Sequence, residues 1–199
     1  ALVAKQGIDI GLKVYTPIVE NMPSGSAIRP GDVLRMRNGK TIEVMNTDAE
    51  GRLIMADALA YASESSPDLI CDVATLTGAA YVALGVEIGA VFSNNNSILD
   101  NFLNSNIKGF ENYHSLPLEQ SYKSLIKSSI ADMKNSGGRF GGAITAALLL
   151  EEFVNDIDWI HLDIAGPGRS RSGSAIYPEG GTGFGVLGYF NFIMEESKN

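Results

Sequence analysis

The chain has 199 residues, of which 45% are hydrophobic, and it carries a formal net charge of -8 with an isoelectric point of about 4.7. This length and apolar content suffice for one globular domain with a sizeable core. The acidic balance argues against nucleic acid and anionic membranes as partners. We see no signal peptide and no apolar run of transmembrane length. The single cysteine, Cys71, excludes an internal disulfide and favours a reducing, intracellular location.

The first 44 residues predict strands and turns. Leu12–Glu20 is apolar and β-branched, which predicts a buried strand. Residues 21–32 are rich in Pro, Gly and Ser and predict a loop. Two alternating runs flank Asn38 and Gly39, so Val33–Val44 is predicted to form a β-hairpin with a type I′ turn.

Helices and apolar strands alternate over the next 50 residues. Apolar residues spaced by three and four predict a helix over residues 51–65, which Pro67 ends. The continuous apolar run over residues 69–76 predicts a central parallel strand covered on both faces, with Cys71 as a buried thiol. Residues 77–85 predict a turn or helix, and Gly89–Asn94 a short strand.

The second half predicts four helices, over residues 98–107, 119–130, 143–154 and 186–197. The glycine-rich Asn135–Gly142 is predicted to be a loop that opens the third of them. Residues 159–166 predict a second apolar strand, followed by a long irregular loop over residues 167–185.

This alternation predicts an α/β fold with a mixed, mostly parallel sheet flanked by helices. Ligands of such sheets bind beyond the carboxyl ends of the strands. The candidate segments are therefore those after Leu76, after Ile164 and around Asp48.

The stretch TDAEGR, Thr47–Arg52, allows two interpretations. A hydroxyl at Thr47 and an acid at Glu50 fit a capping box, and acids in a first turn suit the helix dipole. Asp48 and Glu50 also have the chemistry of ligands for a divalent ion, and a carboxylate can bridge two ions. Arg52 opposes the dipole, which favours a nearby anion or carboxylate cluster.

For three further features, a structural interpretation is stronger than a functional one. The loop GGRFGG, with Arg139, could cradle a phosphate, but close helix packing is the simpler explanation. His161 lies on an apolar strand and is interpreted as a satisfied core histidine. Asp163 points opposite to its apolar neighbours and could bond loop amides near the candidate segments.

The stretch NTDAEGRLIMADAL resembles the signature of the leucyl aminopeptidases, the cytosolic M17 metallopeptidase family. Further stretches of the sequence resemble other segments of that family: ENMPSGSAIRPGDVLRMRNGKTIEV, DVATLTGA, HLDIAGP and GGTGFGV. The resemblance covers nearly the whole chain. It implies a three-layer α/β sandwich of the aminopeptidase and phosphorylase type, a cytoplasmic location and a homohexamer.

The resemblance also implies cofactors, namely two divalent ions, zinc or manganese, and a bicarbonate ion. Asp48 would ligate one ion through its carboxylate and backbone carbonyl, and Glu50 would bridge both. Arg52 would hold the bicarbonate, which acts as general base on the metal-bound water. The reaction implied is hydrolysis of the first peptide bond of a peptide.

The substrates implied are peptides with a free N-terminus and a Leu-like first residue. The backbone of Thr75, Leu76 and Gly78 would line the bicarbonate and substrate region. Ala165 would begin the loop that shapes the pocket for the N-terminal side chain.

The family's other metal ligands lie in an upstream segment of the GKG…FD.GG type, which this sequence does not contain. Lys5, Asp9 and Lys13 occur in a different pattern, and no role is transferred to them. We therefore expect residues 1–199 to be the C-terminal part of the catalytic domain, without the family's N-terminal domain, and to be inactive alone. The alternative is a non-catalytic module that keeps the fold for assembly with partners. DNA binding, which some family members show, is disfavoured by the acidic charge.

Overall fold

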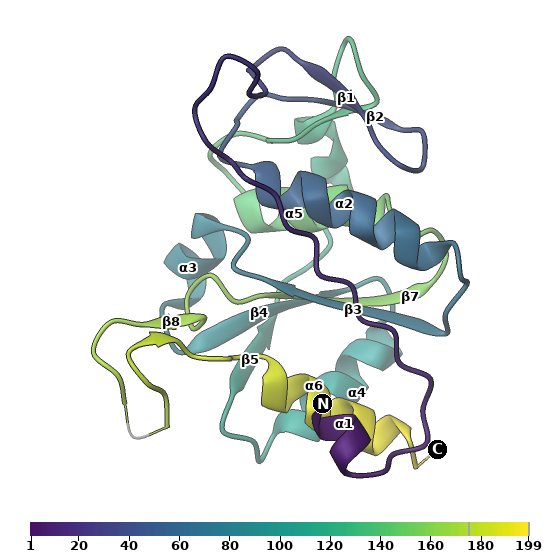
Figure 1. The fold of residues 1–199 in the computed structure, drawn as a ribbon, viewed down its shortest axis with the longest axis vertical. Helices are drawn as coiled ribbons and strands as arrows, with labels where there is room; N and C mark the ends of the chain where they lie inside the picture. The colour runs from purple at the N-terminus through teal and green to yellow at the C-terminus, as the bar shows by residue number, and fades with distance from the viewer. Residues whose placement is uncertain (175, 199) are drawn as a thin grey trace. The chain divides into compact units, whose positions relative to one another are not determined.

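The computed structural model describes residues 1–174 and 176–198, and the chain divides into two compact units. Unit 1 contains Ala1–Val14, Asp72–Leu116 and Ile160–Asn199, and unit 2 contains Tyr15–Cys71 and Pro117–Trp159. Figure 1 shows their helices and strands in chain order. No helix in the described ranges has both the length and the apolar character needed to cross a membrane.

The first two strands of unit 2 form the predicted hairpin. Strands β1 (Val33–Arg35) and β2 (Thr41–Glu43) pair antiparallel. The Met36 N–H donates to the Lys40 carbonyl (2.8 Å), and Gly39 has a φ of 90°. The loop therefore has three residues with glycine in the left-handed position, as in a turn followed by a bulge. The predicted type I′ turn is wrong, because Asn38 is not among the described non-glycine residues with positive φ.

A third strand, which the sequence did not predict, extends this small sheet. Strand β6 (Met133–Lys134) pairs parallel with β2, so the strand order is β1-β2-β6. The ladder continues past β6, where the Asn135 N–H donates to the Glu43 carbonyl (2.9 Å). At the start of the β2–β6 ladder, the Asp132 carboxylate accepts hydrogen bonds from the Thr41 N–H and from the Thr41 hydroxyl, both at 2.7 Å.

Two α-helices form the core of unit 2. Helix α2 (Glu50–Ser63) buries Leu53, Ala56 and Leu59, as its apolar spacing predicts. Helix α5 (Gly142–Glu151) is almost entirely buried, and it lies alongside α2 (Figure 1).

The helix predicted over residues 119–130 is wrong in type and length. Residues Gln120–Ile126 form a 3-10 helix, η1, which ends at Lys127 in an extended conformation, and residues 129–132 are bends. Serines explain the difference, because their side chains bond the local backbone instead of leaving it to an α-helix. The Ser124 hydroxyl donates to the Ser121 carbonyl (2.8 Å), and the Ser128 hydroxyl accepts the Ile130 N–H (3.1 Å).

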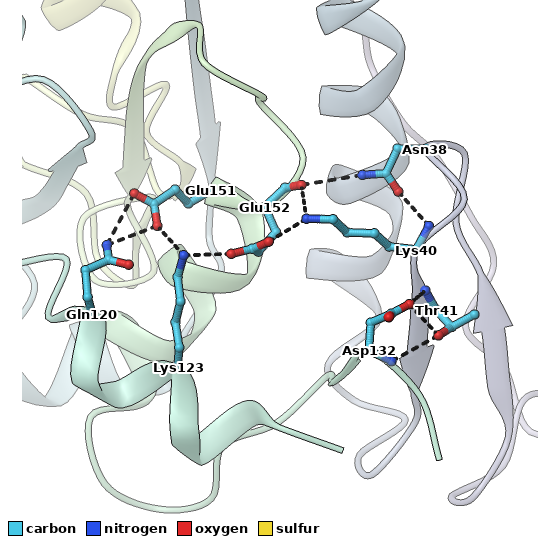
Figure 2. A network of polar contacts seen from close by, with 8 residues as sticks. All are labelled: Asn38, Lys40, Thr41, Gln120, Lys123, Asp132, Glu151 and Glu152. Carbon is cyan, nitrogen blue, oxygen red and sulfur yellow. Dashed lines mark hydrogen bonds and ion pairs between the residues drawn. The ribbon is translucent and has the colours of Figure 1, made fainter. Parts of the chain in front are cut away.

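A polar network ties the hairpin and η1 to the end of α5 (Figure 2). The Glu152 carboxylate pairs with both Lys40 and Lys123. Lys123 also pairs with Glu151 (3.3 Å), which accepts the Gln120 amide (3.1 Å). Partial burial alone would raise the pKa of Glu152, but the two ammonium groups outweigh it, so its pKa lies below the usual range.

Unit 1 is organised around a mixed four-stranded sheet, which confirms the predicted α/β class. The strand order is β3 (Leu69–Ala74), β7 (Asp158–Asp163), β4 (Ile88–Ser93) and β5 (Asn112–Ser115). Strand β4 pairs parallel with β5 and antiparallel with β7, while β3 and β7 begin in unit 2.

Strand β3 is an edge strand of this sheet rather than the predicted central one. Its burial alternates, and Val73 is 44% exposed. Cys71 is exposed as well, so the predicted buried thiol is wrong. Cys71 and Val73 are two positions apart and so point to the same face of the sheet, which is the exposed face at β3.

The helices of unit 1 are α1 (Leu2–Lys5), α3 (Gly78–Leu84), α4 (Asn96–Asn106) and α6 (Val186–Glu196). Phe102 of α4 makes edge-on ring contacts with Tyr113, Tyr189 and Phe192, at centroid distances from 4.9 to 5.7 Å. The predicted long loop before α6 contains a short ladder, β8 (Arg169–Ser170) with β9 (Gly180–Gly181), and Ala175 lies outside the described residues.

The strand predicted over Leu12–Glu20 does not form. These residues adopt neither helix nor strand, and Val14 and Ile18 are 78% and 86% exposed. A strand needs a neighbour to complete its hydrogen-bond ladder, and strand propensity alone does not supply one.

Candidate functional site

The segment between β2 and α2 is a tight turn that carries the acidic motif. The Asn46 carbonyl accepts the Ala49 N–H (3.2 Å), and the Asn46 side-chain oxygen accepts the Asp48 N–H (3.0 Å). The Asp48 side chain is exposed, and the next residues lead directly into α2. The turn therefore presents Asp48 to solvent just before the helix.

The capping-box interpretation of this motif is wrong. Helix α2 begins at Glu50, and its N-cap residue is Ala49, which offers no side-chain cap. Thr47 precedes the N-cap by two residues, so a Thr47 hydroxyl and a Glu50 carboxylate do not occupy the N-cap and N3 positions that a capping box requires. Capping does not explain why two acids stand here.

Glu50 has an unusual environment for a carboxylate. It is half-buried, and its Oε2 atom is buried without a hydrogen-bond partner among the described residues. Leaving a buried acceptor unsatisfied costs about 1–3 kcal/mol, and more for a charged group. Its place in the first turn of α2 stabilises the negative charge through the helix dipole. Arg52, also half-buried, follows one residue beyond Gly51.

These groups fit part of a metal site. An unsatisfied carboxylate oxygen beside a second carboxylate in sequence is the donor chemistry of a hard divalent cation. However, no group of three His, Cys, Asp or Glu side chains that could hold a metal occurs within residues 1–174 and 176–198. The described chain thus offers two candidate ligands, Asp48 and Glu50, and not a complete set.

In unit 1, a buried carboxylate organises the loops after β3 and β7. Asp163 ends β7 and is 1% exposed. Its Oδ1 accepts the N–H groups of Leu76 (3.1 Å), Thr77 (3.3 Å) and Ala165 (3.2 Å). Its Oδ2 accepts the Thr77 hydroxyl at 2.6 Å. Asp163 therefore does bond the loop amides, as its position on the strand predicted.

Thr77 connects this arrangement to α3. Its hydroxyl oxygen accepts the Ala80 N–H (3.0 Å), which caps the helix. The four residues predicted for the substrate and bicarbonate region lie in the segments that Asp163 joins: Thr75, Leu76, Gly78 and Ala165. Their grouping within unit 1 is a feature of the structure, while their function stays a prediction.

The loop after β7 is too tightly packed for side chains at two of its glycines. A Cβ atom on Gly166 would lie 1.9 Å from the Gly85 carbonyl oxygen. A Cβ on Gly168 would lie 2.8 Å from the Ile164 oxygen and from Cγ2 of Thr75. The sequence AGPG thus allows this loop to pack closely on its neighbours.

His161 is a satisfied core histidine, as predicted. It is 1% exposed, its Nδ1 lies 2.5 Å from the Asp72 Oδ1, and its ring stacks on Phe92. Burial lowers the pKa of His161, but the Asp72 carboxylate and the more distant Asp163 outweigh this, so the pKa is raised above its ordinary value.

One residue at the site was missed by the sequence prediction, which placed Asn135 only at the start of a loop. Asn135 is fully buried, and its side chain bonds the backbone of Met45 and Asn46 in the acidic turn. The one available signal was a polar residue two positions after the apolar Met133. The glycine-rich loop that follows is tightly packed at Gly137, where a Cβ would lie 3.0 Å from Thr145, and open at Gly138, where a Cβ would meet nothing within 4 Å.

Comparison with known proteins identifies the family. Residues 1–188 match the family model described as cytosol aminopeptidase family, catalytic domain. The chain therefore belongs to the cytosol aminopeptidase family, M17.

Two curated relatives carry the name probable cytosol aminopeptidase. The chain is 50% identical over 189 residues to the one from Syntrophotalea carbinolica, covering 95% of this chain and 38% of the relative. It is 49% identical over 190 residues to one from a Synechococcus strain, and the match covers 94% of this chain and 39% of that relative. The chain thus spans about two fifths of the length of these relatives.

Solved structures show the same likeness. The cytosol aminopeptidase from Coxiella burnetii is 42% identical, with a TM-score of 0.85 over 90% of this chain and 39% of that one. A tomato leucine aminopeptidase variant is 43% identical, with a TM-score of 0.82 over 87% and 34%. The bottromycin maturation enzyme BotP in complex with Mn is 41% identical, with a TM-score of 0.86 over 90% and 41%.

Proposed function

We propose that this chain supplies the bridging carboxylate turn and the substrate loops of a two-metal aminopeptidase. The observation that carries the proposal is the buried Glu50 Oε2, which has no hydrogen-bond partner among the described residues, beside Asp48 at the start of α2. Membership of the cytosol aminopeptidase family supports it. The reaction proposed is release of N-terminal, Leu-like residues from peptides.

In this proposal Asp48 and Glu50 hold two divalent ions, and Arg52 holds a bicarbonate. The ions, when bound, would supply Lewis acidity that polarises water and the scissile carbonyl. A relative solved with manganese supports a divalent ion of that kind, zinc or manganese. The Arg52 guanidinium, near the N-terminal end of α2, offers the bicarbonate a cation and helix N–H groups.

The substrate loops would act through backbone carbonyls more than through amides. The N–H groups of Leu76 and Ala165 already donate to Asp163, so they are not available to a ligand. The carbonyl groups are the polar groups that these residues retain. Carbonyl oxygens accept hydrogen bonds, which suits the N–H groups of a bound peptide.

The activity would belong to the whole protein, since the chain spans about two fifths of its relatives. We propose that residues 1–199 alone are inactive, because the described residues hold no three-ligand group. The name cytosol aminopeptidase among the relatives supports a cytoplasmic protein acting on peptides with a free N-terminus. A homohexamer is part of the same proposal.

The test is hydrolysis of a leucyl chromogenic amide by the full-length protein with added manganese or zinc. Glu50→Gln and Asp48→Ala should each lower kcat/KM by about a hundredfold or more, because each removes a charged ligand. Asp68→Asn, which changes an exposed aspartate, should leave it unchanged. Wild-type activity in both site variants would refute the proposal. An inactive full-length protein that still assembles would favour the non-catalytic module instead.

A further inference from the structure

The side chain of Asn135 lies where no solvent reaches it, with an exposed fraction of 0%. It follows β6, and its backbone N–H extends the β2–β6 ladder by donating to Glu43. That pairing places the side chain beside the segment that leaves β2 and leads to Asp48.

The carboxamide of Asn135 uses both of its ends on this segment. Its Oδ1 accepts the N–H groups of Met45 (2.8 Å) and Asn46 (3.2 Å). Its Nδ2 donates to the Asn46 carbonyl at 2.7 Å. The side chain therefore pairs with the Asn46 backbone through an acceptor and a donor, as the peptide of a neighbouring strand would.

Asn46 is in turn the anchor of the acidic turn. Its side-chain oxygen accepts the Asp48 N–H, and its carbonyl accepts the Ala49 N–H. Asn135 is thus two hydrogen bonds away from the Asp48 backbone and from the N-cap of the helix that carries Glu50.

Only an amide side chain meets these demands without burying a charge. An aspartate has the same shape but no donor at neutral pH for the Asn46 carbonyl. An apolar side chain would leave the N–H groups of Met45 and Asn46 without this acceptor, at about 1–3 kcal/mol for each one left buried, and the Asn46 carbonyl would keep only the Ala49 N–H.

We infer that Asn135 is a positioning residue for the metal-binding turn, holding Asp48 and Glu50 where their oxygens can share an ion. The inference rests on the proposed function. Partners that orient metal ligands typically change metal affinity by about 10- to 100-fold when they are mutated. Asn135 acts through the backbone of Asn46, so its loss should affect the affinity for metal as well as stability.

The experiment measures Mn²⁺ affinity and Mn²⁺-dependent activity in the full-length protein. The variant is Asn135→Ala, and the matched control is Asn106→Ala. Asn106 is also buried, at 7% exposed, and its amide also bonds backbone carbonyls, those of Phe102 and Gly188 in unit 1. Both substitutions should lower thermal stability.

Only Asn135→Ala should weaken Mn²⁺ binding, by about tenfold, and its activity should recover at saturating Mn²⁺. A purely structural role would not produce this recovery. Equal Mn²⁺ affinity in Asn135→Ala, Asn106→Ala and the wild type would overturn the inference.

Two further measurements keep the outcome decisive. If Asn135→Ala does not fold, Asn135→Asp takes its place. Its added negative charge by itself favours cation binding, so weaker Mn²⁺ binding would show a displaced turn, and unchanged or tighter binding would count against the inference. Asp48→Ala tests the site itself. If Asp48→Ala binds Mn²⁺ like the wild type, the proposed function is refuted. If Asp48→Ala loses Mn²⁺ binding while the Asn135 variants keep it, only the proposed role of Asn135 is refuted.

Discussion

Substituting Asp163 by asparagine should loosen the two loops that it joins while leaving unit 1 folded. Asparagine has the same shape and keeps an oxygen for the N–H groups of Leu76, Thr77 and Ala165. It replaces Oδ2 by an NH₂ group, which then faces the Thr77 hydroxyl at 2.6 Å. That hydroxyl oxygen already accepts the Ala80 N–H, so its own proton loses its acceptor.

The size of the effect follows from the bonds that change. A hydrogen bond to a charged group contributes about 1.5–3 kcal/mol, and a neutral one about 0.5–1.5 kcal/mol. Losing the Thr77 bond should therefore lower the free energy of local opening by about 1.5–3 kcal/mol. Since each 1.36 kcal/mol is a factor of ten, amide exchange in the opened segment should speed up about 10- to 150-fold.

Hydrogen exchange followed by mass spectrometry on the full-length protein measures this directly. Peptides that cover residues 75–80 and 164–168 should exchange faster in Asp163→Asn, while those from α2 should not change. Asp100→Asn, at an exposed position of α4, is the matched control. Exchange within twofold of the wild type in both segments would show that the Asp163 carboxylate does not hold these loops.

For two other perturbations, the structure determines whether the stability of the protein rises or falls. The pKa of His161 is raised in the folded state, so its pair with Asp72 stabilises the fold fully below about pH 6.5, its pKa in the unfolded chain. This contribution to the free energy of unfolding is lost as the pH rises through the folded-state pKa. The urea midpoint of the wild type should therefore fall between pH 5.5 and 8.5, and Asp72→Asn should flatten that slope; a midpoint that rises would contradict the assignment. Gly166→Ala should cost about 3 kcal/mol or more, because its Cβ would lie 1.9 Å from the Gly85 carbonyl oxygen. Gly181→Ala, whose Cβ meets nothing within 4 Å, is the control in urea unfolding, and equal midpoints would refute the clash.

Elements whose pattern is local and long were predictable from the sequence. Helices α2 and α6 and strand β7 have apolar spacings that need no partner to be recognised. The short strands β5 and β6 contain NYHS and MK, and they are strands only because neighbours supply a ladder.

Leu12–Glu20 is the converse case, with strand propensity but no strand neighbour in the described chain. Propensity and pairing thus decide independently whether a strand forms. The same rule explains β3. Its apolar sequence predicts a central strand, but β3 has one strand neighbour, β7, in the described sheet and is therefore an edge strand.

At the candidate site, the sequence could name Asp48, Glu50 and Arg52 but could not choose between a cap and a ligand set. That choice depended on where α2 begins, and boundaries are the least reliable part of a sequence prediction. In the structure α2 begins at Glu50, two positions after Asp48, and this start excludes the capping explanation.

Asn135 could not be predicted, because 89 residues separate it from Asn46 and no local pattern links them. The link is a matter of register. Parallel pairing sets Glu43 opposite Lys134, and the ladder ends on Asn135 at the point where the chain leaves β2. A slip of one residue would turn the Asn135 side chain to the other face and leave Met45 and Asn46 without their partner. The three-stranded sheet β1-β2-β6, which holds no candidate ligand itself, is therefore what places the acidic turn.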